Sequence, residues 1–149
     1  MENMIPHKPR AWDMSVKPYT MQIVEGINWH GDGVWFNEIT DDETATDWCH
    51  FEDCILMDYT MLKDCNKQKI YDADVVLMRW TQHDILEPFL IFKTPSGEWR
   101  VDDGIKGTVL KFRHDDVRVV GNIFEHNYPK LKEEWLLRQQ QLKQYNNEV

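Results

Sequence analysis

The stretch that decides the fold is residues 70–80, IYDADVVLMRW, which holds the strongest strand signal in the chain. Its centre, Val75-Val76-Leu77-Met78, is a continuous apolar run. A short run of this kind is typical of a strand buried on both faces, although periodicity alone does not separate such a strand from a buried helix. The preceding residues 63–69 are polar and predict a turn. We therefore expect a buried strand at residues 70–80.

A hairpin is predicted directly downstream of this strand. Residues 89–93 and 98–102 are rich in apolar and aromatic side chains, and Thr94-Pro95-Ser96-Gly97 lies between them. Proline at the second turn position and glycine at the fourth favour a type I turn. The two flanking runs are therefore expected to pair with each other.

Further short strands are predicted on both sides of this region. Turn residues separate them, and the runs lie at residues 19–29, 33–39, 54–60, 108–113 and 117–124. Short strands spaced about ten residues apart favour a small barrel or roll. We expect a mainly β fold, a short-stranded roll whose residues 54–126 could close a small barrel.

The C-terminal segment has a different pattern. After Pro129, which suits a first helical turn, the chain is rich in Leu, Glu, Gln and Lys, all good helix formers. Leu131, Trp135, Leu142 and Tyr145 recur on one face at helical spacing. We predict a helix over residues 129–149. Its apolar stripe either docks on the protein's own sheet or packs against a neighbouring copy.

The composition is that of a globular protein. The chain has 149 residues, about one ordinary domain, with 42% hydrophobic and 29% charged residues. The start of the chain lacks the apolar region of a signal peptide, and no stretch approaches the roughly 18 apolar residues of a membrane span. We expect a protein of the cytoplasm with no membrane association.

Negative charge is concentrated in one segment. The net charge is −9, and no Lys or Arg lies between Lys17 and Lys63, whereas ten acidic residues do. The rest of the chain holds 16 acidic and 17 basic residues. The acidic segment is either a solvated face that keeps the protein soluble or a surface that meets a basic partner.

A specific version of the second interpretation is mimicry of DNA phosphates. Asp41, Asp42, Glu43 and Asp47 would then contact a DNA-acting protein of the host. A calcium site is disfavoured, since the segment lacks the spacing of a calcium-binding loop. The absence of basic residues here also argues against duplex-DNA binding by this part of the chain.

The search for catalytic and metal-binding patterns is negative. Cys49, Cys54 and Cys65 with His50 have a spacing that matches none of the usual zinc patterns. An odd cysteine count gives no self-contained disulfide framework, so reduced thiols are expected. No serine nucleophile motif, phosphate-binding loop or zinc-protease motif occurs. We expect no enzyme activity, no cofactor and no metal.

Nucleic-acid binding stays open for the C-terminal half. Lys111, Arg113 and Arg118, together with His114, fall in two strands that we expect to be adjacent. Trp80 and Trp99 could provide the aromatic surfaces on which single strands stack. Aromatic residues in short strands more often belong to the core, and the sequence leaves both interpretations standing.

Three segments resemble the YopX family of bacteriophage and prophage proteins. These are residues 10–13 (RAWD), 59–76 (YTMLKDCNKQKIYDADVV) and 119–127 (VVGNIFEHN). The family usually has the pattern Y-T-G-L-K-D-x-N-G-x-x-I-Y-E-G-D, with glycine where we place Met61, Gln68 and Ala73. Because glycine adopts positive φ at no cost, we expect the turns at these residues to differ from those of the family.

The resemblance implies a phage or prophage origin and an SH3-like small barrel in the C-terminal half. It implies a YopX-like domain over residues 1–128, followed by the helix at 129–149. It assigns no catalytic residue, and it implies self-association. We therefore expect a non-enzymatic interaction module that forms a homo-oligomer, with an acidic inhibitor of a host DNA-acting protein or a nucleic-acid-binding protein as the alternatives.

Overall fold

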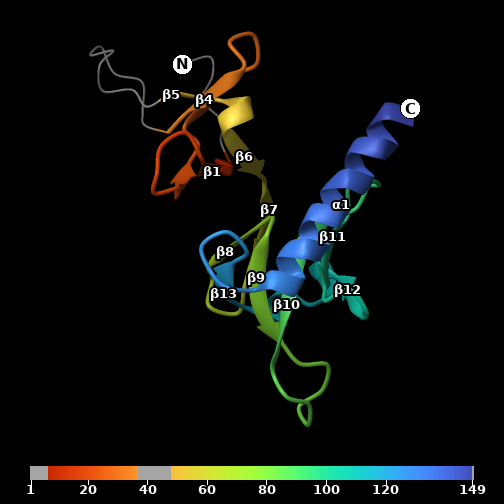
Figure 1. The fold of residues 1–149 in the computed structure, drawn as a ribbon. Helices are drawn as coiled ribbons and strands as arrows, with labels where there is room; N and C mark the ends of the chain where they lie inside the picture. Colours follow the sequence, from red (N-terminus) through yellow and green to blue (C-terminus); the bar gives the residue numbers. More distant parts are fainter. Residues whose placement is uncertain (1–6, 37–47, 149) are drawn as a thin grey trace. The chain divides into compact units, whose positions relative to one another are not determined.

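The computed structural model describes residues 7–36 and 48–148. The chain divides into two compact units, Met1–Tyr59 and Thr60–Val149. Each unit is a set of short antiparallel strands around a core of its own (Figure 1). The predicted mainly β fold with a C-terminal α-helix is confirmed.

The first unit contains two three-stranded sheets. One has the order β2 (Thr20–Ile23), β1 (Arg10–Asp13) and β6 (Cys54–Met57). The other has the order β3 (Gly26–Asn28), β4 (Gly33–Trp35) and β5 (Trp48–His50), and the short 3-10 helix η2 (Phe51–Asp53) joins β5 to β6. The apolar core of this unit consists of Ala11, Val24, Val34, Phe36, Cys49 and Cys54.

The second unit is built on a five-stranded antiparallel sheet. The strand order is β12 (Gly107–Val109), β11 (Trp99–Asp102), β10 (Glu87–Lys93), β9 (Asp74–Met78) and β13 (Arg118–Asn122). A two-stranded hairpin of β7 (Tyr59–Lys63) and β8 (Lys69–Tyr71) precedes it. An SH3-like barrel is compatible with this sheet and stays a prediction.

Residues 70–80 contribute to two strands rather than forming the single strand that we expected. β8 and β9 are separated by a turn at Asp72 and Ala73, where Ala73 has φ 70°. The Asp74 carboxylate accepts a hydrogen bond of 2.8 Å from the Tyr71 backbone N–H, which fixes this turn. The apolar run after the turn is buried as predicted, apart from the half-buried Leu77. A local carboxylate-to-backbone bond therefore interrupts an otherwise continuous strand pattern.

The hairpin predicted at residues 94–97 is confirmed. β10 and β11 pair in register from Leu90–Asp102 to Lys93–Trp99, and the Gly97 N–H donates to the Thr94 carbonyl at 2.9 Å. Gly97 has φ 90°, the left-handed conformation that glycine tolerates best.

The prediction of a strand across residues 108–113 is wrong beyond Val109. The strand β12 ends there, and two short 3-10 helices follow, η3 (Leu110–Phe112) and η4 (His114–Asp116). Leu110 is the one residue of η3 that is buried in the core. The Leu110 side chain enters the core where the strand ends, and the next two residues, Lys111 and Phe112, are exposed.

The helix α1 (Pro129–Glu148) packs against one face of the second unit's sheet (Figure 1). Leu131 and Trp135 are buried, and the Arg138 guanidinium lies 5.0 Å from the ring centroid of Phe92 on β10. Tyr145, which we predicted in the same docked stripe, is about half exposed (48%). Thus the first half of the helix belongs to the core and the second half does not. Although α1 has 20 residues, no helix in the described residues is long and apolar enough to cross a membrane.

Candidate functional site

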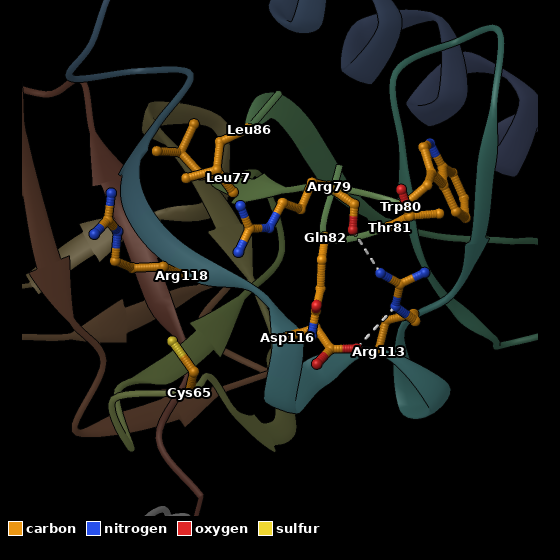
Figure 2. A pocket seen from close by; sticks show the side chains of 10 residues that line it. All are labelled: Cys65, Leu77, Arg79, Trp80, Thr81, Gln82, Leu86, Arg113, Asp116 and Arg118. Carbon is orange, nitrogen blue, oxygen red and sulfur yellow. Dashed lines mark hydrogen bonds and ion pairs between the residues drawn. The ribbon is translucent and has the colours of Figure 1, made fainter. Parts of the chain in front are cut away.

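A surface pocket of the second unit has a volume of about 460 Å³ (Figure 2). It lies at the β9–β10 connection and beside β13. The lining residues come from β9, β13, η4 and the connecting loops: Cys65, Leu77, Arg79, Trp80, Thr81, Gln82, Leu86, Arg113, Asp116 and Arg118. We call it the arginine pocket, since Arg79, Arg113 and Arg118 line it.

Strand register explains why Arg79 and Arg118 lie on the same face of the sheet. Arg118 on β13 pairs directly with Leu77 on β9, so their side chains lie on the same face of the sheet. Arg79 follows Leu77 by two residues and continues that face, because side chains alternate along an extended chain. Further along the same face, Val75 and Leu90 are fully buried. The pocket therefore forms where the covered part of this face ends.

Arg113 is held rigidly at one side of the arginine pocket. Its Nε donates to the Asp116 carboxylate at 3.0 Å, and its Nη2 donates to the Arg79 carbonyl at 2.7 Å. Its guanidinium also lies 5.3 Å from the ring centroid of Trp80. These three contacts fix the side chain in one geometry. Arg113 thus forms a wall that joins η4 to the end of β9.

Arg79 and Arg118 differ from Arg113 because they are exposed and have no acidic partner among the described residues. Within residues 7–36 and 48–148, neither of them makes an ion pair. Figure 2 shows the Arg79 guanidinium pointing toward the side of the pocket where Leu77 and Arg118 lie. With Asp116 as the single acidic residue of the lining, three guanidinium groups face one carboxylate. The arrangement attracts an anion.

The structure brings together two of the three basic residues that we predicted as nucleic-acid contacts. Arg113 and Arg118 line the arginine pocket, whereas Lys111 lies exposed on η3 outside the lining. The expected pair of adjacent strands is wrong, because η3 and η4 occupy residues 110–116. Sequence reasoning missed Arg79. Its position two residues after Leu77, on the same face, was the available signal.

The predicted stacking role of the tryptophans does not fit their surroundings. One face of Trp80 is covered by Arg113, and its ring meets Phe89 edge to face with centroids 6.1 Å apart. Trp99 packs against the core and lies under Lys93. Both rings are partly buried structural residues. In the arginine pocket, Trp80 positions Arg113.

The four predicted partner-binding acids, Asp41, Asp42, Glu43 and Asp47, lie outside the described residues. The division of the chain nevertheless sharpens the charge asymmetry. Of the 26 acidic and 17 basic residues, 12 acidic and three basic ones lie in residues 1–59. Residues 60–149 therefore hold 14 of each. The first unit carries the whole net charge of −9, and the arginine pocket belongs to the neutral second unit.

The three cysteines occupy different environments. Cys49 and Cys54 are buried in the first unit, and Cys65 is exposed at the arginine pocket. Burial is the main cause that raises the pKa of Cys49 to about 12, and burial also raises the pKa of Cys54. In the described part of the chain, no group of three or more His, Cys, Asp or Glu side chains could hold a metal ion.

Buried polar residues stabilise the β7–β8 hairpin and its exit. The Asp64 carboxylate accepts hydrogen bonds from the backbone N–H groups of Asn66, Gln68 and Val119, at 2.8, 2.9 and 2.8 Å. The Thr60 hydroxyl donates to the Ile70 carbonyl at 2.7 Å. Asp64 thus closes the hairpin turn and links it to β13. These side chains are committed to the backbone, so their role is structural.

Three residues of this region have left-handed backbone conformations. The φ angles are 70° for Met61, 65° for Lys67 and 70° for Ala73. Met61 and Ala73, which stand where the family pattern has glycine, both adopt the left-handed conformation that glycine favours. The third such residue is Lys67 rather than Gln68, so the corresponding glycine of the pattern falls one position earlier than we placed it.

Comparison with known protein families shows which family this chain belongs to. The family described as YopX protein matches residues 8–131, most of the chain. The chain belongs to the YopX family. The crystal structure of protein EF1440 from Enterococcus faecalis is similar, with a TM-score of 0.49 and 19% sequence identity, covering 82% of this chain and 95% of that one. A search of the curated proteins found no match.

The middle segment of the YopX resemblance contributes to the scaffold of the second unit and holds none of the three pocket arginines. Asp64 and Thr60 belong to the middle segment and bond to the backbone. Arg79, Arg113 and Arg118 all lie outside the three segments. Within the second unit, the middle segment therefore contributes to the fold, and the three arginines give the pocket its charge.

Proposed function

We propose that this YopX protein is a non-enzymatic binding module that recognises an anionic partner through the arginine pocket. The observation that carries the proposal is the pair of exposed guanidinium groups, Arg79 and Arg118, held on one sheet face without ion-pair partners in the described residues. Arginine forms bidentate hydrogen bonds with phosphate and carboxylate groups. A pocket of about 460 Å³ is large enough for such a group together with the moiety that carries it.

The rigid wall of the pocket supports the same proposal. Arg113 is fixed by Asp116, the Arg79 carbonyl and Trp80, so the backbone of Arg79 is held in place. A site with a preorganised wall loses less conformational entropy when its ligand binds. The pocket residues supply binding groups, above all the guanidinium groups of Arg79 and Arg118.

The test uses Cys65 as a reporter at the edge of the pocket. The native chain is treated with iodoacetamide, an uncharged reagent, near pH 8, with and without inorganic tripolyphosphate at matched ionic strength. The raised pKa of Cys49 and of Cys54 keeps both thiols protonated at this pH, and both are buried, so alkylation reports Cys65. We expect tripolyphosphate to slow the alkylation of Cys65, as measured by mass spectrometry.

Variants assign this protection to the arginines. R79A and R118A are expected to lose it, whereas R138A is expected to retain it, because Arg138 lies on α1 and pairs with Glu134 away from the pocket. Equal alkylation rates with and without tripolyphosphate in the native chain would contradict the proposal.

A second candidate function is self-association through α1. Leu136 and Leu137 are 46% and 48% exposed and border a shallow groove with Lys130, Glu133 and Glu134. Exposed apolar side chains that gather on one surface mark sites of contact with other proteins. A second copy of the chain is the proposed occupant.

We expect the native chain to exceed its 17.9 kDa monomer mass in light-scattering measurements and the variant L136E/L137E to fall to that mass. Q144E is the control, since it adds charge to an exposed position of the same helix outside the groove. Removing residues 129–149 entirely is a poor test, because Leu131 and Trp135 belong to the core. A native chain that is already monomeric at high concentration would refute this candidate.

A further inference from the structure

The arginine pocket has an apolar part as well as a charged one, and this combination narrows the class of ligand. Leu77 and Leu86 line the pocket together with Arg79 and Arg118. The neighbouring Ile85 is 82% exposed. An inorganic anion or a carboxylate group has no apolar part that could contact such a surface. A ligand that joins a phosphate to a flat apolar ring would contact both parts.

Polar groups at the β9–β10 loop add to this pattern. Thr81 and Gln82 both line the pocket. The Thr81 hydroxyl is bonded to the Asp84 carboxylate at 3.1 Å, so the loop is held in shape. The exposed Gln82 amide can donate and accept hydrogen bonds at the edge of a ring. Bases that are not stacked in a duplex expose both their faces and their hydrogen-bonding edges.

The amount of positive charge argues against a double-stranded ligand. Duplex binding without sequence preference depends almost entirely on neutralising phosphates with Lys and Arg side chains. The arginine pocket offers two guanidinium groups that lack ion pairs within the described residues, and residues 60–149 have no net positive charge. Two phosphate contacts and the apolar part of the pocket suit a single strand. The bases of such a strand can supply the remaining contacts.

We infer that the arginine pocket binds single-stranded nucleic acid, with adjacent phosphates at Arg79 and Arg118 and one unstacked base against Leu77 and Leu86. The inference rests on the proposed function, because it specifies the anion that the same pocket takes. Trp80 acts as a positioning residue for Arg113 rather than as a stacking surface.

The experiment is fluorescence anisotropy with the full-length native chain. The probes are a labelled short oligonucleotide, as DNA and as RNA, and the duplex of the same sequence. We expect at least one of the single strands to bind about tenfold or more tightly than the duplex. The slope of log K against log salt should be about −1.4, the value for two phosphates on a single strand.

Arginine variants test the contacts one at a time. R79A and R118A should each reduce that slope to about −0.7, because each removes one phosphate contact. L86S should weaken binding without changing the slope, since it removes apolar contact and leaves the charge unchanged. R138A is the matched control and should keep both the affinity and the slope of the native chain.

The outcomes separate this inference from the proposed function. Equal affinity for single strand and duplex would overturn the inference. So would a slope unchanged in R79A and R118A. If no oligonucleotide binds while tripolyphosphate still protects Cys65, the inference fails and the proposed function survives. Protection by polyglutamate without oligonucleotide binding also overturns the inference and indicates an acidic protein partner. If no anion protects Cys65 from alkylation, the result contradicts both the inference and the proposed function.

Discussion

The substitution D64A is expected to lower the free energy of unfolding by about 3–4 kcal/mol. Asp64 is 1% exposed, and its carboxylate accepts three backbone hydrogen bonds, two within the β7–β8 turn and one from Val119. Removing it leaves the Val119 N–H, which is partly buried, without its acceptor. Chemical denaturation followed by circular dichroism measures the loss.

The matched control for this prediction is D103A. The Asp103 carboxylate also accepts two backbone hydrogen bonds in a turn, from Ile105 and Lys106, but both bonds are exposed. Water can replace an exposed acceptor, so we expect a loss of about 1 kcal/mol or less. If D64A and D103A destabilise the protein equally, the buried bond to Val119 contributes little, and the link between hairpin and β13 is not the anchor that we describe.

The substitution W135A is expected to destabilise the protein by about 3–5 kcal/mol. The Trp135 ring is 3% exposed, and it packs edge to face on Phe124 with centroids 5.4 Å apart. Its Nε1 donates a 2.9 Å hydrogen bond to the buried Asp72 carboxylate. The substitution therefore removes a large apolar side chain and also the indole donor to Asp72. Denaturation curves of the variant and the native chain give the difference.

Two further variants show how much of the destabilisation comes from the lost hydrogen bond and how much any change on the helix would cause. W135F keeps most of the ring and loses the donor, so we expect it to cost about 1–2 kcal/mol. L137A lies on the same helix at a half-exposed position and should cost less than about 1 kcal/mol. If W135A were as mild as L137A, α1 would not be part of the core of the second unit. That result would reopen full removal of the helix as a test of self-association.

The hydrogen bonds of Asp64 with Val119 and of Asp72 with Trp135 show what the YopX pattern contributes to the fold. Asp64 and Asp72 both lie in the middle segment of the resemblance, and both act on other parts of the fold, Val119 on β13 and Trp135 on α1. Acidic residues in such a segment could have been taken for catalytic groups. Their burial and their bonds to backbone and indole donors indicate a structural role instead. The pocket arginines lie outside these three segments.

Features that depend on neighbouring residues were predictable from the sequence. The turn at residues 94–97 follows from proline and glycine at fixed positions, and α1 follows from a run of helix-forming residues. The burial of the apolar run in β9 followed from its composition. The concentration of net charge in the first unit is likewise a property of the sequence. Each of these features depends on a short stretch of neighbouring residues or on the number of charged residues in a segment.

The tertiary structure alone decided where strands break and which side chains meet. The turn at Asp72 and Ala73 depends on a carboxylate bond to Tyr71, and η3 forms where Leu110 enters the core. The arginine pocket joins Arg79, Arg113 and Arg118, which are up to 39 residues apart in the sequence. Their convergence is set by the register of β9 against β13 and by the path of η4, and such long-range pairing leaves no periodic signal in any single segment.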